Sequence, residues 1–515
     1  MRITNKIIQR NNLANINNNK IYQDKLSTQM STQKKIAKPS DDPVVAIRAL
    51  RLRSNVTEVS QYYSKNIPDA KSWLEITESA LTNQSEVMTS MIEQCTKGAN
   101  GDLTAKDRQI ILEQLKALGD EVYSTANADY AGRYVFTGYR TDTPVSFKTA
   151  SDIPYTITEQ IKPADLDMVT SINTGNLGEI TDNNFMDDAY NTMSEAEISE
   201  DKVNRIRLSY DKCDASYQPS ISYQVLVSGG DEPVYEWKTW DDATMMHSYE
   251  DPYKAAANDD DAFIFVPETG ELLLGKNRYN TLMASKDDVL TTGDESEIRV
   301  NYQKSNWQAG DLRPEHYFYC EADGIEYNPD YLTTTRERQD IEYDVGFNQT
   351  IRVNSTADEC FQHGIGRTVD DLVTSLEDVS NLEETKNRIK EALKKAPENS
   401  EEAKVLNKQL QAADKALTLA KDKNQKLFEA GISTFQKYLD DVSLSITNCG
   451  NRSKKLELIE NRMQNQKTTF ETLQSENEDI DIAEAAIQLN SAQLTYEAAL
   501  MATGKVSQNS LLNYI

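Results

Sequence analysis

The sequence predicts a mainly α-helical protein: an elongated antiparallel helical rod or coiled coil formed by both chain ends, with an inserted mainly-β domain. Apolar residues recur at three- and four-residue spacing in long segments near both ends of the 515-residue chain, as amphipathic helices require. Between about residues 141 and 345 the pattern changes to short β-rich runs joined by turn residues. Because a helix of about 50 residues spans roughly 75 Å, the flanking segments favour a rod that serves assembly.

The first long helix is predicted over residues 44 to about 97. Asp42 is placed to cap it, and Pro43 occupies the first helical position, where a missing N–H costs nothing. Pro68 lies inside the apolar pattern and is expected to kink or break the helix. A second helix is predicted over roughly 104–130, before the break "GRYVFTGYRTDTPVSF".

The middle of the chain is predicted to form hairpins. Three stretches each join two β-rich runs across a turn with Gly or Asp: "ISYQVLVSGGDEPVYEW" (221–237), "FIFVPETGELLLG" (263–275) and "YFYCEADGIEYN" (317–328). These hairpins predict a separate, mainly β domain inserted into a helical one.

Helical spacing returns from about residue 366, with a turn predicted at 394–402. The last helix carries a continuous 3–4 seam from Leu456 to Met501, typical of a coiled coil. Four seam positions are polar: Gln466, Asn477, Glu484 and Ser491. They either fix register and partner, as polar seam residues do, or face solvent where the seam drifts.

The charge balance argues against nucleic-acid binding. The chain has 83 Asp and Glu against 55 Lys and Arg, a net charge of −28, whereas nucleic-acid binding needs a basic face. The ends differ in sign: residues 1–60 hold eleven basic and four acidic side chains (+7), and residues 476–515 hold one and six (−5). These segments either attract each other or a neighbour's counterpart, or are simply two solvated faces.

Targeting signals and the positions of the cysteines limit where the protein is expected to reside. No apolar core of a secretory signal follows Ile8, and no run of about 18 apolar residues predicts a membrane-spanning helix. The five cysteines are far apart in sequence and form no disulfide framework or metal cluster. These features predict a cytoplasmic protein, or one exported by a route without a cleavable signal.

Signals for catalysis are weak, and no catalytic, cofactor-binding or metal site is predicted. The three histidines lack zinc-site spacing, and no nucleophile elbow occurs. "GELLLGKN" (270–277) has the skeleton of a phosphate loop, but Asn277 replaces the magnesium-binding hydroxyl and the leucines favour a strand. The acidic run "NDDDAF" (258–263) lacks the ligand register of a calcium loop, so a solvated loop is favoured.

Aromatic residues interleave the predicted strands and allow two interpretations. They form ordinary cross-strand pairs and core, or they form a face for glycan binding. The residues concerned are Tyr223, Tyr235, Trp237, Trp240, Tyr317, Phe318 and Tyr319.

Motifs at both ends resemble one known family. "MRITNKIIQRNNLANINNNK", "KPSDDPVVAIRALRLRSNV" and "KNIPDAKSWLEITESALTNQSEVM" resemble, in order and spacing, the N-terminal helical region of bacterial flagellins. "YVFTGYRTDTPVSF", "YDVGFNQTIRVN" and the C-terminal stretch from "LELIENRMQNQKTTF" to "SLLNYI" are similar to the hook–filament junction type of this family, the hook-associated protein 3 (FlgL) type. The opening "MRIT" and the ending "SLLNYI" favour that type over filament flagellin.

The resemblance implies a structural adaptor of the extracellular flagellum and no enzyme. Its members are exported through the flagellar type III apparatus without a cleaved signal peptide. The implied partners are the first hook-associated protein, flagellin, further copies of the chain in a ring-like assembly, and an export chaperone on the C-terminal helix. Neither a cofactor, nor nucleic acid, nor a membrane is implied. The alternatives are a filament flagellin and, from another class, a glycan-binding or hydrolytic module in the β domain.

The expected division has five segments. Residues 1–40 form an N-terminal assembly helix that pairs with a C-terminal one over 470–515. Residues 41–140 and 346–469 form the two halves of the helical rod domain, and 141–345 the inserted β domain. The expected assembly interface is apolar and lies in the terminal segments: Ile3, Ile7, Ile21, Ile480, Ile487, Leu494, Met501, Val506, Leu511, Leu512, Tyr514 and Ile515.

Overall fold

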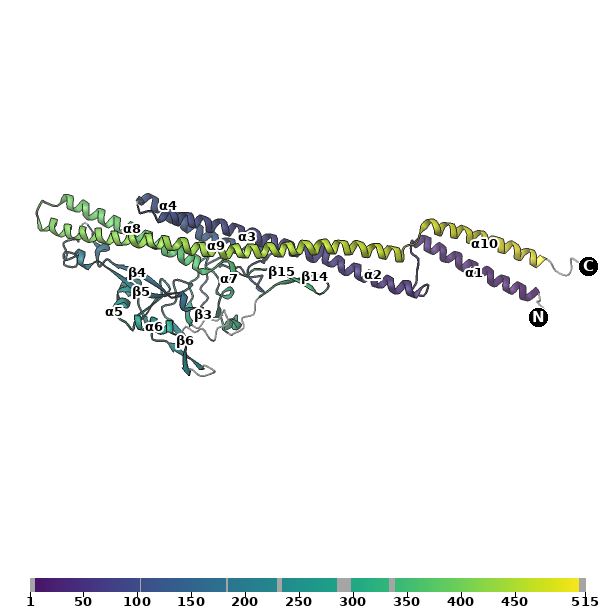
Figure 1. The fold of residues 1–515 in the computed structure, drawn as a ribbon, viewed down its shortest axis with the longest axis horizontal. Helices are drawn as coiled ribbons and strands as arrows, with labels where there is room; N and C mark the ends of the chain where they lie inside the picture. The colour runs from purple at the N-terminus through teal and green to yellow at the C-terminus, as the bar shows by residue number, and fades with distance from the viewer. Residues whose placement is uncertain are drawn as a thin grey trace, which may run out of the picture. The chain divides into compact units, whose positions relative to one another are not determined.

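A computed structural model describes residues 5–101, 103–181, 184–228, 234–284, 298–332 and 339–508. Contacts divide the chain into two compact units. Unit 1 comprises the described residues of Met1–Lys71, Tyr343–Ile351 and Lys454–Ile515, and unit 2 those of Ser72–Glu342 and Arg352–Ser453. The predicted fold class is confirmed: long helices form both ends of the chain, and a sheet-rich region lies between them in the sequence (Figure 1).

Unit 1 is built mainly from helices at the two ends of the chain. The N-terminal part supplies α1 (Asn5–Thr32), α2 (Pro43–Gln61) and the start of α3 (Ile67–Gly98). The C-terminal part supplies the end of α9 (Glu401–Glu478) and α10 (Ile482–Gln508). Helices α1 and α10 lie side by side (Figure 1). A hairpin of β14 (Glu342–Gly346) and β15 (Gln349–Arg352) lies largely in the same unit.

Two local predictions for the first helix are confirmed. The carboxylate of Asp42 accepts hydrogen bonds from the backbone N–H groups of Val44 and Val45, at 3.0 and 3.1 Å, so it caps α2. A single π-helical turn, Tyr62–Asn66, separates α2 from α3 just before Pro68. A proline removes one helical N–H donor and clashes with the preceding turn, and a wider turn at that point accommodates it.

The predicted continuous C-terminal seam is wrong at one place. Helix α9 ends at Glu478, and α10 begins at Ile482. Asp481 causes the restart, because its carboxylate accepts from the N–H groups of Ala483 and Glu484 and so caps α10. An aspartate prefers this capping role to a helix interior, and the 3–4 spacing of apolar residues carries no information about such a break.

Unit 2 contains long helices together with the sheets. Its helices are the rest of α3 and α9, with α4 (Ala105–Thr125), α5 (Pro252–Asn258), α6 (Lys276–Ala284), α7 (Ala357–Cys360) and α8 (His363–Lys395). Helices α8 and α9 share one apolar cluster that includes Val379, Leu382, Ala412 and Ala416. They are joined by the predicted turn near 394–402. Gly98 ends α3 against the ring of Phe428, where a β-carbon would lie 2.2 Å from the ring.

The strands of unit 2 form two larger sheets, and the three predicted hairpin pairs are confirmed. A six-stranded sheet has the order β13-β12-β3-β11-β6-β7, and a five-stranded sheet the order β4-β5-β10-β9-β8. All pairs are antiparallel except β8 with β9. The strands are β1 (Asp129–Tyr130), β2 (Arg133–Tyr134), β3 (Tyr155–Ile161), β4 (Asp167–Asn173), β5 (Ser199–Arg207), β6 (Ser220–Ser228), β7 (Val234–Trp240), β8 (Thr244–Met245), β9 (Phe263–Val266), β10 (Glu271–Leu274), β11 (Ile298–Lys304), β12 (Tyr319–Ala322) and β13 (Ile325–Tyr327).

An aromatic cluster fills the core beside the six-stranded sheet. The Trp307 ring stacks on Phe147, with ring centroids 4.9 Å apart, and meets Tyr155 and Tyr210 edge-on. Edge-to-face and offset contacts of this kind add to the free energy of burial. The cluster fixes the loops around Ser209–Lys212 and Gln308–Leu312, which line a cleft.

Candidate assembly surface

Helices α1 and α10 pair through a narrow face of small and medium side chains. On α10, Ala485 and Ala492 are buried, and on α1 Leu26 is buried, with Ile8 and Ile16 partly covered. Alanine at two positions one heptad apart allows the helix axes to approach closely. Because so few side chains are buried, the pair leaves much of its apolar surface open.

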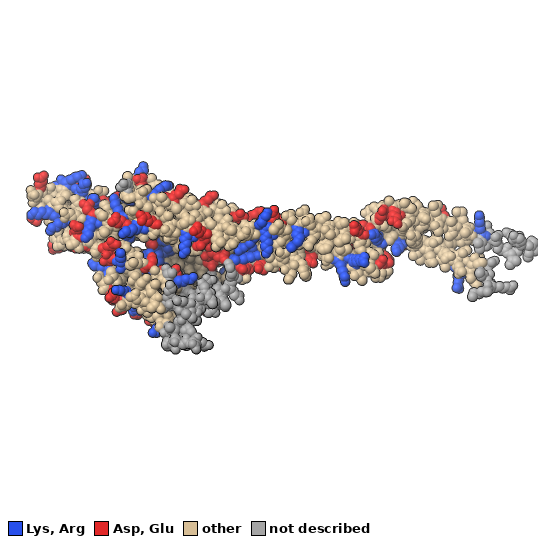
Figure 2. Space-filling view, in the orientation of Figure 1, with Lys and Arg blue, Asp and Glu red and all other residues tan. Residues whose placement is uncertain are grey.

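The open apolar surface of α10 is a regular stripe. Ile487, Leu494 and Met501 are exposed by 70, 68 and 66% and stand seven residues apart, so they share one face of the helix. On this end of unit 1, few charged side chains cover the visible face (Figure 2). We refer to Ile487, Leu494 and Met501 as the α10 stripe. Monomeric proteins rarely leave a contiguous apolar row in water without a partner for it.

A small groove lies beside the α10 stripe. It has a volume of about 350 Å³ and runs between α1 and α10. Its residues come from both helices: Asn19, Tyr22, Ile487, Gln488, Ser491, Ala492 and Thr495. Tyr22 and Ile487 therefore belong to one continuous surface rather than to separate helix faces.

Seven of the twelve predicted interface residues lie in the part of the chain that the structure describes. Six are described with their side chains, and Val506 by its backbone position alone. Ile7 and Ile21 are exposed on α1, and Ile480 is half-buried between α9 and α10. Ile487, Leu494 and Met501 form the α10 stripe, and Val506 lies in the last turns of α10. Ile3, Leu511, Leu512, Tyr514 and Ile515 lie outside the described residues.

Sequence periodicity missed several exposed apolar side chains in unit 1. On α1 these are Leu13 and Tyr22, and on α2 they are Val44, Ile47 and Leu50. Among the large apolar side chains that the structure describes, the most exposed is Phe347, at 87%, in the turn between β14 and β15. On α2 the exposed residues lie beside buried residues of the same helix, and only the burial of each side chain distinguishes the two groups.

A polar clamp joins the two helical breaks of unit 1. We define it as Lys34 and Arg53 with Glu478 and Asp479. Lys34 and Asp479 form an antiparallel backbone bridge, supported by N–H donation from Lys35 to Glu478 O at 2.7 Å. Ile480 likewise donates to Gln33 O at 3.1 Å. The clamp therefore fixes the point at which α1 ends and α10 begins.

Charge pairing strengthens this clamp. Arg53 donates from Nε and Nη2 to the two carboxylate oxygens of Glu478, at 2.7 and 2.6 Å, and Lys34 Nζ lies 2.5 Å from Asp479 Oδ1. The Glu478 side chain is 2% exposed. Donation from Arg53 lowers the pKa of Glu478, and donation from Lys34 lowers the pKa of Asp479 and raises that of Lys34 itself.

The phosphate-loop alternative is excluded by strand and backbone geometry. Leu272–Leu274 lie in β10, as the strand interpretation predicts. The N–H of Gly275 donates to Ala262 O and that of Asn277 to Asp260 O, both at 2.8 Å. A β-carbon on Gly275 would lie 2.4 Å from two carbonyl oxygens. The backbone amides that would bind a phosphate are therefore occupied.

Most of the aromatic residues considered for a glycan face serve the core. Tyr223 and Tyr317 are buried, and Trp240 packs against Tyr223. Trp237 is exposed and carries Arg299 over its ring, with a 4.4 Å separation. The side chain of Tyr235 lies outside those described. The interpretation as core and cross-strand packing therefore holds for the inner strands.

The described histidines and cysteines form no metal site. His316 Nε2 donates to Pro144 O, 3.0 Å away, and His247 lies near Glu268. Within the described ranges no group of three or more His, Cys, Asp or Glu side chains could hold a metal ion. All five cysteines are buried free thiols. Among the described helices, none has the length and apolarity needed to cross a bilayer.

The terminal helices α1 and α10 pair with each other yet leave apolar rows in water. Exposed apolar rows of this kind mark interaction sites, because association buries what folding leaves exposed. Residues 3–141 match the bacterial flagellin N-terminal helical region. The expectation of a flagellin-type N-terminal region is therefore confirmed.

Two relatives are about one-third identical to part of the chain. Over 144 residues, 28% of the chain, it is 33% identical to flagellar hook-associated protein 3 of Salmonella typhimurium. Over 145 residues it is 32% identical to the protein of the same name from Escherichia coli. The matched part spans 45% of the length of each of these relatives.

Solved structures resemble the chain more distantly. A putative flagellar hook-associated protein from Vibrio parahaemolyticus aligns over 85% of this chain and 100% of its own, with 14% identity and a TM-score of 0.37. The flagellar hook-associated protein 3 of Legionella pneumophila aligns over 82% and 98%, with 12% identity and a TM-score of 0.29.

Proposed function

We propose that this chain is a structural adaptor of the bacterial flagellum, placed at the junction between the hook and the filament. The observation that carries the proposal is the match of residues 3–141 to the flagellin N-terminal region, with about one-third identity to hook-associated protein 3. The proposed location is the extracellular flagellum, reached through the flagellar type III apparatus without a cleaved signal peptide.

The mechanism proposed for assembly uses the α10 stripe. In an isolated chain, Ile487, Leu494 and Met501 face water. Full burial of an apolar side chain of this size contributes about 1.5–3 kcal/mol, so the three together contribute on the order of 5 kcal/mol before ordering costs are subtracted. Neighbouring copies, and the predicted residues of the C-terminal tail, would supply the covering surface.

The partners proposed are those of a junction protein. Further copies of the chain would form a ring-like assembly, with the first hook-associated protein on one side and flagellin on the other. An export chaperone would cover the C-terminal helix before secretion, since an exposed apolar row invites aggregation. No enzymatic role is proposed.

A localisation experiment tests this proposal against a filament flagellin. A strain lacking the chain's own gene is complemented with an epitope-tagged copy, and the tag is labelled with gold for electron microscopy. Label confined to the hook–filament boundary, with filaments restored, is expected. Label along the whole filament would instead identify a filament subunit, and filaments that form normally without the gene would contradict a required junction.

A further inference from the structure

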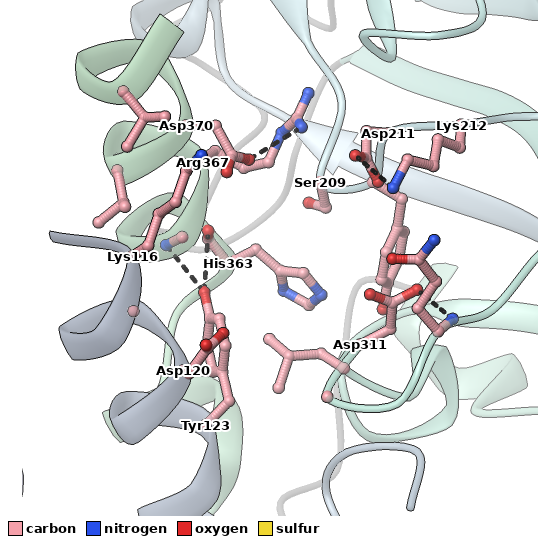
Figure 3. Close-up of a pocket in the computed structure, with 18 of the residues that line it drawn as sticks. Lys116, Asp120, Tyr123, Ser209, Asp211, Lys212, Asp311, His363, Arg367 and Asp370 are labelled. Carbon is pink, nitrogen blue, oxygen red and sulfur yellow. Dashed lines mark hydrogen bonds and ion pairs between the residues drawn. The ribbon is translucent and has the colours of Figure 1, made fainter. Parts of the chain in front are cut away.

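A cleft in unit 2 has no part in the proposed assembly. Its volume is about 570 Å³, within the range of about 300–1,000 Å³ typical of small-molecule sites. Helix α4 contributes Lys116, Asp120 and Tyr123, and the first turns of α8 contribute His363 and Arg367 (Figure 3). Loops at 209–212 and 308–312 close the other side.

At the floor of the cleft, His363 has an unused polar atom. Its side chain is held among the rings of Tyr210, Tyr317 and Phe318, with centroids 4.8, 4.3 and 5.2 Å away. The residue is only 9% exposed, and Figure 3 shows its ring directed into the cleft. Among the described residues, Nε2 has no hydrogen-bond partner. Buried polar atoms nearly always have one, so a bound molecule at the floor would satisfy it.

The charges that line the cleft are largely paired with one another. Arg367 lies 3.4 Å from Asp370, and Lys212 lies 3.9 Å from Asp211. Asp311 and Asp211 both neighbour the buried amine of Lys304, at 3.5 and 3.3 Å. Binding a small ion would require these pairs to separate. The lining therefore favours a neutral ligand that both donates and accepts hydrogen bonds.

His363 itself is uncharged near neutral pH. Burial, together with the positive charge of Arg367, lowers its pKa to about 3. A neutral imidazole can donate or accept at Nε2, depending on tautomer. Asp120 on α4 is exposed, and the described residues give it no hydrogen bond or ion pair. It is thus a free acceptor at the mouth of the cleft.

Apolar side chains complete the lining. Leu312 and Val369 are almost fully buried behind the cleft, and Val373 lies one turn further along α8. A molecule with a ring of C–H groups and several hydroxyls would match this mixture of apolar floor and paired donors and acceptors. Hydroxyls donate to carboxylates and accept from ammonium and guanidinium groups without carrying charge themselves.

From this geometry we infer that the cleft between α4, α8 and the 209–212 and 308–312 loops binds a neutral polyhydroxylated molecule, of the size of a mono- or disaccharide. Asp120 is assigned as a hydroxyl acceptor at the mouth, and His363 Nε2 as a polar contact at the floor. This site is independent of the assembly surface, which lies in unit 1.

The test uses the full chain and a panel of ligands. Glucose, galactose, N-acetylglucosamine and maltose are titrated by calorimetry and saturation-transfer NMR, beside inorganic phosphate and calcium as charged probes. We expect saturable binding of at least one sugar with a Kd below about 10 mM, and no saturable binding of either ion. Failure of all four sugars to saturate, or saturable binding of phosphate or calcium that competes with them, overturns the inference.

Two variants test whether the sugar binds in this cleft. Asp120→Asn should weaken the sugar at least fivefold, because a charged acceptor is lost from an exposed position that does not affect folding. His363→Phe retains an aromatic ring in the cage and removes Nε2, and should also weaken binding at least fivefold. Glu113→Gln, on α4 outside the cleft, is the matched control and should change Kd less than twofold. Binding unaffected by both cleft variants would place the sugar elsewhere and contradict the inference.

Discussion

The terminal helices of unit 1 and the long helices of unit 2 share one sequence pattern but use it differently. In unit 2, α8 buries a row that includes Ile365, Leu372, Leu376 and Val379. In unit 1, α10 buries two alanines and leaves Ile487 and Leu494 in water. The comparison shows that apolar periodicity predicts a helix face that needs a partner, and that only the tertiary structure tells whether the same chain supplies it.

The largest expected effect comes from removing the α10 stripe. If the chain assembles as proposed, changing Ile487, Leu494 and Met501 together to Ser should reduce incorporation into flagella more than 100-fold, because burial of the stripe would contribute on the order of 5 kcal/mol. The unfolding temperature of the isolated chain should be unchanged. Sedimentation of sheared flagella with immunoblotting measures incorporation. Loss of the folded chain itself would show that the stripe belongs to an internal core.

Two phenylalanines, one buried in unit 2 and one exposed in unit 1, should differ in their contribution to stability. Changing Phe435, which is fully buried on α9 in unit 2, to Ala should lower the free energy of unfolding by about 3–5 kcal/mol. Changing Phe347, the most exposed large apolar side chain described, to Ala should lower the free energy of unfolding by less than about 0.5 kcal/mol. Chemical denaturation followed by circular dichroism measures both. Equal losses in the two variants would mean that Phe347 is covered within the chain.

Loosening the clamp should have an intermediate effect confined to unit 1. Arg53→Gln removes the bidentate donor of Glu478, whose carboxylate is buried, and should lower the free energy of opening α1 and α10 by about 1–3 kcal/mol. Hydrogen exchange of amides in α1 and α10 measures this opening. Arg51→Gln, an exposed arginine on the same helix, is the control. Uniform acceleration of exchange in both variants would argue against a clamp.

Acid should weaken the same clamp. The pKa of Glu478 and of Asp479 lies below the ordinary values of 4.5 and 3.8, so each carboxylate binds its proton more weakly in the folded chain than in the unfolded one. Their stabilising contribution is therefore fully present above about pH 4.5 and is lost as the pH falls through the lower folded pKa values. Limited proteolysis at pH 7 and pH 3.5, with Glu478→Gln as the comparison, should show less acid sensitivity in the variant. A variant that responds to acid as strongly as the native chain contradicts this assignment.

The smallest expected effect is at the start of α2. Asp42→Ala removes the cap that accepts from Val44 and Val45 and should cost about 1 kcal/mol, seen as faster hydrogen exchange in the first turn of α2. Asp42→Asn retains a capping oxygen and should cost less. If Asn and Ala behave alike, the capping hydrogen bonds contribute little.

Much of this protein was determined by local sequence. Capping by Asp42, the irregular turn before Pro68, the turn between α8 and α9, and the hairpin strands around Leu272 follow from short-range backbone chemistry, which neighbouring residues control. The motifs near the N-terminus likewise predict the flagellin N-terminal helical region that residues 3–141 match. The break at Glu478–Ile482 was missed, because an apolar 3–4 pattern continues across a cap that only Asp481 and the backbone of Gln33 establish.

Only the tertiary structure decided which apolar rows are covered. Periodicity gave no sign that Val44, Ile47 and Leu50 on α2 are exposed, nor that Phe347 is. The cleft beside His363 depends on residues from four separate segments, brought together by helix and sheet packing. Burial is a property of contacts between distant parts of the chain, and the order of residues along one helix face does not contain it.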